Sequence, residues 1–247
     1  MPVGQGPAHL LTADLNLDGN LDLVSANTKN STLTILYGKG TGSFDSALSL
    51  NVAAEPTMSA VGDIDRDGYP DLVVNARGAK MFLVLQGNGD GTFRKPIPTR
   101  TGKVPLNIIL GDYNHDDKLD AAVTLTFDKM ELYLGNGDGR FKKGATYLTG
   151  SRSFSGVTQD FNEDGHLDIA LAASSSSASS IRLFIGNGDG TFQKPKRVAE
   201  KLVPLAVVAS DMNDDGKPDL VFAAGQGDNL YMLYSNGDGS FKEPISF

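Results

Sequence analysis

The segment DLNLDGNLD, residues 14–22, returns four more times along this chain with acidic residues at the same offsets. The other copies are DIDRDGYPD at 63–71, DYNHDDKLD at 112–120, DFNEDGHLD at 160–168 and DMNDDGKPD at 211–219. Their first residues are 49, 49, 48 and 51 positions apart. Such a regular spacing indicates a repeat architecture, in which one supersecondary unit is copied along the chain.

A second, glycine-rich pattern that ends in Phe follows each acidic segment. The copies are GKGTGSF ending at Phe44, GNGDGTF at Phe93, GNGDGRF at Phe141, GNGDGTF at Phe192 and SNGDGSF at Phe241. The first Asp and this Phe are 30, 30, 29, 32 and 30 residues apart, so the whole unit repeats. The glycines are expected to permit positive φ in a hairpin turn, and the five Phe side chains to pack between neighbouring units.

Short apolar runs bounded by turn residues predict strands, and no stretch has helical spacing and caps. In the second unit the expected strands are 57–62, 72–75, 80–86 and 97–101. Four antiparallel strands per unit of about 50 residues are typical of propeller blades. We therefore predict an all-β, five-bladed β-propeller with four antiparallel strands per blade.

The five units fill residues 1–247 as a single domain. When the units are aligned, Phe247 falls opposite Leu50 and Val3 falls opposite Val52. The chain therefore begins and ends within the same strand of the repeat. This alignment predicts a ring closed by the N- and C-terminal parts of one strand, which would leave no free sheet edge. The alternative is that the five units are a piece of a larger ring.

The acidic segments present oxygen donors at positions 1, 3, 5 and 9, a spacing that wraps one cation. Donor sets of oxygen alone suit a hard ion, and Ca²⁺ accepts about six to eight such ligands in a flexible loop. We predict up to five Ca²⁺, one per repeat. The expected side-chain ligands are Asp14, Asn16, Asp18 and Asp22; Asp63, Asp65, Asp67 and Asp71; Asp112, Asn114, Asp116 and Asp120; Asp160, Asn162, Asp164 and Asp168; and Asp211, Asn213, Asp215 and Asp219.

Position 7 is expected to offer its backbone carbonyl, because its side chain varies in chemistry. The residues there are Asn20, Tyr69, Lys118, His166 and Lys217. Position 6 is Gly in four copies and Asp117 in the third, where a positive φ is expected. An EF-hand would need Glu at position 12, which no copy has. The remaining alternative is an ordinary Asp-Gly hairpin whose side chains cap the turn.

The net charge of −8 and a pI near 4.8 argue against a nucleic-acid partner, which would need clustered cations. No apolar run is long enough to span a bilayer, so membrane insertion is not expected, and no signal peptide is recognised in MPVGQGPAHLL. The three histidines fall in different units without a nucleophile and base beside them, so no enzymatic activity is predicted.

The repeated acidic segment paired with GNGDGxF resembles FG-GAP or VCBS-type repeats, which are similar to those of the integrin α-subunit propeller. The resemblance covers the whole chain, although the first unit departs from it with GKGTG at 38–42. It implies a β-propeller that carries Ca²⁺ between the first two strands of each blade. It also implies an extracellular or cell-surface setting.

We therefore expect an extracellular binding or adhesion module, lectin-like or protein-binding, with its ligand on the face opposite the calcium loops. The alternatives are a passive or engineered scaffold, or an accessory propeller of a polysaccharide-degrading enzyme. Missing Trp weakens the glycan reading, because an aromatic ring often packs on a sugar. The candidate ligand residues are Lys29, Asn30, Arg77, Lys80, Phe127, Lys129, Gln226, Asp228, His9, Arg100, Lys103, Arg152 and Phe154.

Overall fold

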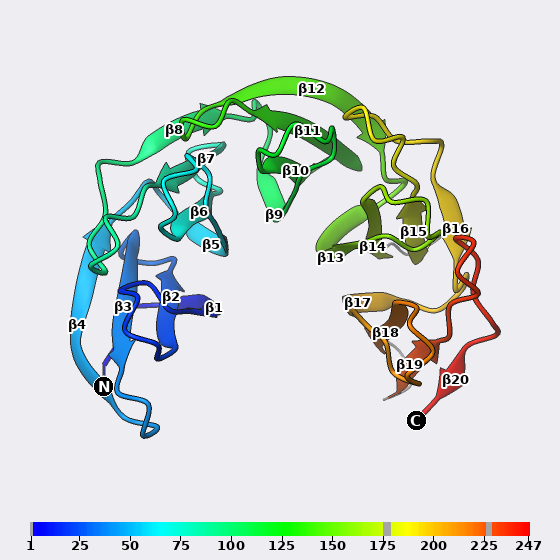
Figure 1. The fold of residues 1–247 in the computed structure, drawn as a ribbon, viewed down its shortest axis with the longest axis horizontal. Helices are drawn as coiled ribbons and strands as arrows, with labels where there is room; N and C mark the ends of the chain where they lie inside the picture. The colour runs from blue at the N-terminus through cyan, green and yellow to red at the C-terminus, as the bar shows by residue number, and fades with distance from the viewer. Residues whose placement is uncertain (1, 175–178, 226–228) are drawn as a thin grey trace. The chain divides into compact units, whose positions relative to one another are not determined.

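The computed structural model describes residues 2–174, 179–225 and 229–247 (Figure 1). Within these ranges every regular element is a β-strand, and no helix has the length and apolar character that a bilayer span requires. The candidate ligand residues Gln226 and Asp228 lie outside the described ranges. The prediction of an all-β chain is confirmed.

The strands form five sheets of four, one per repeat. The first sheet contains β1 (Pro7–Ala13), β2 (Asp22–Asn27), β3 (Thr32–Gly38) and β4 (Phe44–Asn51); the second contains β5 (Pro56–Gly62), β6 (Asp71–Ala76), β7 (Met81–Leu85) and β8 (Ile97–Arg100). The third contains β9 (Pro105–Gly111), β10 (Asp120–Leu125), β11 (Lys129–Gly135) and β12 (Phe141–Leu148). The fourth contains β13 (Arg152–Gln159), β14 (Asp168–Ser174), β15 (Ser180–Phe184) and β16 (Lys196–Val198), and the fifth contains β17 (Pro204–Ser210), β18 (Asp219–Ala224), β19 (Leu230–Leu233) and β20 (Ile245–Ser246).

Each sheet is a meander, because its strands follow one another in sequence order. Neighbouring strands are antiparallel, as in the fourth sheet, where Ala170 pairs with Leu183 and Leu183 with Lys196. Five four-stranded meanders in series are the blades of a β-propeller, as predicted. Closure of a ring by the two chain ends stays a prediction.

The chain divides into two compact units, which are Met1–Ile108 with Gly135–Lys142, and Ile109–Leu134 with Lys143–Phe247. The core of the first unit lies between the first and second sheets and includes Leu33 and Leu83. In the second unit the fourth and fifth sheets share a core that includes Leu183 and Phe222, and β13 packs beside β17. In both units the buried residues come mostly from the second and third strands, whose alternation with turns was visible in the sequence. The prediction of a single domain stays a prediction.

In the fourth and fifth repeats, the repeated Phe side chain joins the glycine-rich turn to the repeat before it. Phe192 packs edge-on against Tyr113 at 5.3 Å between ring centroids, and Phe241 packs against Phe161 at 5.9 Å. The turns also bond to the same segments, since Gly190 N–H donates to Tyr113 O and Gly239 N–H to Phe161 O. Tyr113 and Phe161 are the second residues of the third and fourth acidic segments. The predicted packing between repeats is confirmed for these Phe residues, and it places the acidic segments and the glycine turns at one end of the sheets.

Candidate metal centres

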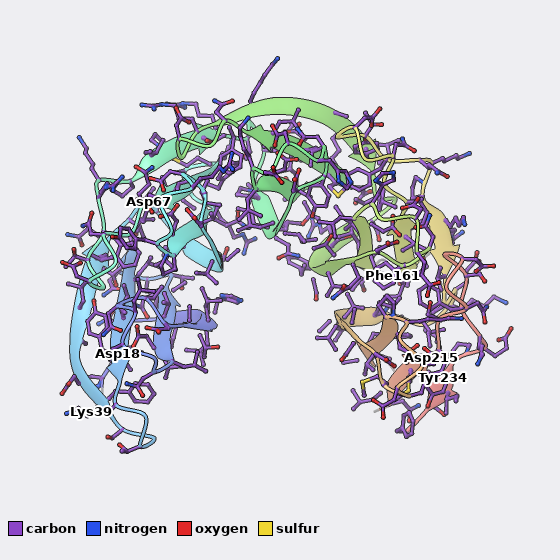
Figure 2. All side chains as sticks on the ribbon, viewed as in Figure 1. Asp18, Lys39, Asp67, Phe161, Asp215 and Tyr234 are labelled. Atoms are coloured by element: carbon purple, nitrogen blue, oxygen red, sulfur yellow. The ribbon has the colours of Figure 1, made fainter. Side chains whose placement is uncertain are left out.

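The acidic segments are the loops between the first and second strands of each sheet, where the sequence places them. They are called loops 1 to 5 here, in chain order. In each loop the first Asp follows the end of the outgoing strand, and the ninth residue is the first residue of the returning strand. Asp18, Asp67 and Asp215, labelled in Figure 2, are the fifth residues of loops 1, 2 and 5.

The Asp at position 1 winds the loop around its own carboxylate. In loop 4, Asp160 Oδ1 accepts a hydrogen bond from Asp164 N–H at 3.2 Å, and Asp160 Oδ2 accepts one from Gly165 N–H at 2.8 Å. The same pair of bonds occurs in the other four loops. At position 5, one carboxylate oxygen accepts the N–H of position 7 in every loop. The backbone of positions 5 to 7 therefore curls around the carboxylates of positions 1 and 5.

Two positions of the loop have left-handed backbone, and only one of them was predicted. Position 6 has φ between 83° and 86° in its four glycines and 61° at Asp117, which confirms the expectation for the third loop. Position 4 is also left-handed, with φ between 56° and 62°, at Leu17, Arg66, His115, Glu163 and Asp214. Sequence reasoning missed this because no glycine marks position 4. The loop tolerates the strain because the Asp at position 1 accepts the N–H groups of positions 5 and 6, the two residues that follow.

The Asp at position 9 is fully buried and holds the loop to the rest of the sheet. Asp22 Oδ2 accepts Leu15 N–H at 2.9 Å, and Asp22 Oδ1 accepts Gly38 N–H at 2.8 Å, at the end of β3. The equivalent pairs join Asp71 to Ile64 and Gly87, Asp168 to Phe161 and Gly186, and Asp219 to Met212 and Ser235. This residue was predicted only as a ligand. Its role as a backbone anchor is a finding of the structure.

Burial makes the charge at position 9 costly. It raises the pKa of Asp71 and of Asp168 to about 6, although the two backbone N–H bonds on each oppose the shift. Neighbouring carboxylates at positions 1, 3 and 5 add to the rise. A cation within the loop would favour the ionised form and cancel this cost. These two loops are thus electrostatically suited to a bound cation.

Loop 2 brings its carboxylates closest together. Oxygens of Asp63, Asp65 and Asp71 all lie within 4.8 Å of one another, and this is the one such cluster of three found in the described part of the chain. Asp65 Oδ1 is buried and has no hydrogen-bond partner. Burial, followed by the nearby Asp67 charge, raises the pKa of Asp65. A buried, unpartnered carboxylate oxygen among other carboxylates fits a hard cation such as Ca²⁺, which these residues would hold.

Cationic side chains also reach the loops. Arg94 Nη1 lies 3.2 Å from Asp65 Oδ2, and Arg94 Nη2 lies 3.1 Å from Asp67 Oδ2. In loop 3, Lys118 Nζ lies 3.0 Å from Asp116 Oδ2. The 16 carboxylates at ligand positions make up more than half of the 30 acidic residues, so such contacts only partly offset their repulsion. Five divalent ions would add ten positive charges and change the formal net charge from −8 to +2.

Position 7 is more restricted than its varied side chains suggested. A Cβ on Gly89 would overlap the Tyr69 ring, and one on Gly188 would overlap the His166 ring. Lys217 Nζ donates to Asn236 O at 3.0 Å, in the glycine turn of its own repeat. In these three repeats the side chain at position 7 therefore packs on the glycine turn, whereas Lys118 pairs with Asp116 of its own loop. That the backbone carbonyl of position 7 is a ligand stays a prediction.

Together, the blades and their acidic loops define a repeat β-propeller with candidate cation sites at one end. A family model described as an FG-GAP-like repeat matches residues 14–74 and 160–222, and one described as an FG-GAP repeat matches residues 59–93. The chain belongs to the FG-GAP-like repeat family, which confirms the resemblance seen in the sequence. FG-GAP repeats commonly bind calcium. No curated protein matches the chain.

Solved structures with the same fold come from several settings. A lectin of Agrocybe aegerita that recognises non-reducing terminal N-acetylglucosamine is 20% identical, with a TM-score of 0.66 over 97% of this chain and 66% of its own. The biofilm matrix protein Bap1 of V. cholerae is 17% identical, with a TM-score of 0.52 over 98% of this chain and 39% of its own. A functionally unknown protein from Desulfotomaculum acetoxidans is 13% identical, with a TM-score of 0.69 over 100% and 71%. This chain spans 66% of the lectin and 39% of Bap1, and the likeness shows the fold.

Proposed function

We propose that this chain is a calcium-binding β-propeller that acts outside the cell as a binding module for a protein or a glycan, without catalysis of its own. Calcium would occupy the acidic loops and stabilise the blade ends. The ligand would bind at the opposite ends of the sheets. The matrix protein and the lectin among the structural neighbours support an extracellular binding role.

The observation that carries this proposal is a polar pocket in the first unit, at the ends of the sheets away from the acidic loops. Its volume is about 510 Å³, and it is lined by Thr28, Lys29, Ser31, Glu55, Thr57 and Arg77. Lys29 and Arg77 are two of the candidate ligand residues named from the sequence. They lie on the β2–β3 and β6–β7 turns, so the pocket draws on two neighbouring repeats.

The backbone around the pocket is held by hydrogen bonds. Arg77 N–H donates to Glu55 O at 3.1 Å, and Lys29 N–H donates to Gln5 O at 3.1 Å. Thr28 Oγ1 donates to Gly6 O at 2.9 Å. A pocket formed by fixed turns presents its side chains at little entropic cost on binding.

Two buried polar atoms at the pocket have no partner. Thr57 Oγ1 and Arg77 Nε are both inaccessible to solvent and make no hydrogen bond. Unpaired buried polar groups cost about 1–3 kcal/mol each, and a rotation of either side chain toward the pocket would let a hydroxyl- or carboxylate-bearing ligand bond to it and relieve that cost. With two cations and one acid in the lining, the pocket favours a neutral or mildly acidic ligand such as a glycan or an acidic peptide segment.

The test is a glycan array and a binding screen against purified cell-surface proteins, both in calcium. The variant Thr57→Val with Arg77→Gln should lose the ligand that the unmodified protein binds. Arg140→Gln is the matched control, since Arg140 belongs to the same unit but is exposed on the glycine turn beside Asp138. Binding that survives the double variant, or no binding to any glycan or surface protein, would refute the proposal.

A further inference from the structure

Two of the three histidines of the chain meet between loops 3 and 4. His115 occupies position 4 of loop 3, and His166 occupies position 7 of loop 4. His166 Nδ1 lies 2.8 Å from His115 Nε2, and the rings are nearly perpendicular, at 79° with centroids 4.8 Å apart. Both belong to the second unit. The sequence placed them in separate repeats and gave no sign of this contact.

Hydrogen bonds within loops 3 and 4 fix the backbone that carries the two rings. His115 has φ of 56°, and the residues that follow it bond to the Asp112 carboxylate. The His166 ring lies against Gly188, where a Cβ would overlap it, and His166 N–H donates to Asp164 Oδ1 at 2.9 Å. The two imidazole nitrogens therefore converge without a large rearrangement of either loop. Such preorganisation is what a ligand-binding pair requires.

The surroundings favour a cation over an anion. Asp116 and Asp164 lie in the same two loops. Hydrogen bonds from Thr191 lower the pKa of Asp189, and the nearby His166 ring adds to that effect, which places the Asp189 carboxylate within electrostatic reach of the pair. Neutral imidazole suits Zn²⁺, Cu²⁺ and Ni²⁺, whereas Ca²⁺ takes oxygen donors. The pair is thus chemically distinct from the acidic loops beside it.

We propose that His115 Nε2 and His166 Nδ1 bind one divalent transition-metal ion, such as Zn²⁺, between loops 3 and 4, through ring nitrogens that are not among the predicted calcium ligands. The ion takes the place of the hydrogen bond between the two nitrogens, and water completes its coordination. Zn–N bonds of about 2.0–2.1 Å in a tetrahedral site place the two nitrogens about 3.3 Å apart, so the rings need to separate by only about 0.5 Å. The bound ion would cross-link the third and fourth repeats.

The experiment is a calorimetric titration with Zn²⁺ of protein kept in excess calcium, so that the acidic loops are already occupied. One zinc ion per chain is expected. His115→Gln and His166→Gln should each weaken zinc binding at least about tenfold, because each removes a ligand. His9→Gln is the matched control, since His9 is the third histidine and lies on β1 of the other unit.

A second measurement guards against loss of folding in the variants. Zinc should raise the melting temperature of the unmodified protein and of His9→Gln, but not of either pair variant, each checked by circular dichroism. His115 is exposed, so its replacement leaves the core intact. Absence of zinc binding in excess calcium, or zinc binding that both pair variants retain, would overturn the proposal.

Discussion

Replacing Asp22 should unfold the first sheet far more readily than replacing Asp18, although both are predicted ligands of the same loop. Asp22 is fully buried and accepts two buried backbone N–H groups, from Leu15 and Gly38. Asp22→Ala leaves both without an acceptor. At about 1–3 kcal/mol for each unpaired group, the variant should lose about 2–6 kcal/mol in calcium-free buffer. That is a large share of the stability of a typical domain, which is about 5–15 kcal/mol.

Asp18 provides the matched comparison. Its carboxylate accepts hydrogen bonds from Asn16 and Asn20, and all of these are exposed to solvent. Water replaces the lost acceptor in Asp18→Ala, so the expected loss of stability in calcium-free buffer is small compared with that of Asp22→Ala. In Asp22→Asn one oxygen remains and a donor faces the other N–H, so its stability should lie between those of the two alanine variants.

The assay is urea unfolding followed by far-ultraviolet circular dichroism, with and without a calcium chelator. Tyrosine fluorescence gives a second probe, since the chain has seven Tyr and no Trp. In calcium the Asp18 variant should also lose stability, because its loop has lost a ligand. Equal losses for the two alanine variants in chelator, or a loss below about 1 kcal/mol for Asp22→Ala, would refute the anchoring role of position 9.

Three further predictions concern single residues. Arg94→Ala frees Asp65 and Asp67 from their ion pairs, so calcium should bind loop 2 more tightly in a calorimetric titration. Weaker binding would contradict the inference that Arg94 competes with the ion for these carboxylates. Gly165→Ala should cost about 1–2 kcal/mol in urea unfolding, because φ is 83° at this position and a residue with a Cβ is strained there. The added methyl meets no neighbouring atom, so the backbone strain is the whole expected cost. An unchanged stability would show that the loop relaxes. Burial lowers the pKa of His9 in the folded protein. Below about pH 6.5 the unfolded chain therefore binds a proton at His9 more readily than the folded protein does, and stability in excess calcium should fall as the pH drops. His9→Gln should remove this part of the pH dependence.

Much of the fold followed from spacing alone. The strand expected at 97–101 is β8 (Ile97–Arg100), and the one expected at 57–62 is β5 (Pro56–Gly62). These boundaries were accessible because an acidic loop or a glycine turn marks one end of each apolar run. The position of the acidic loops between the first two strands of each sheet was predicted for the same reason.

The parts of the site that were missed depend on three-dimensional contacts. The left-handed backbone at position 4 falls on residues as different as Leu17 and Glu163, so no residue type signals it. The His115–His166 contact joins position 4 of one loop to position 7 of the next. That contact depends on the offset between neighbouring blades, which repeat spacing does not reveal. The anchoring role of Asp22 could not be predicted from the sequence, because a metal ligand and an acceptor of backbone hydrogen bonds can both be an Asp side chain.

The hydrogen bonds explain why positions 1 and 9 of the loop are always Asp in this chain, whereas position 3 accepts Asn. Position 3 is Asn in four of five copies, and there a single oxygen accepts one N–H, as Asn16 does from Asp18. Positions 1 and 9 are Asp in all five copies, and in loop 1 both oxygens of Asp14 and both of Asp22 accept backbone N–H groups. An amide has an NH₂ group in place of the second oxygen, so it cannot accept two N–H groups that point at different atoms of the side chain. Cation binding alone would tolerate an amide oxygen at any of these positions, so the pattern of Asp and Asn reflects the hydrogen bonds within the loop and not only its charge.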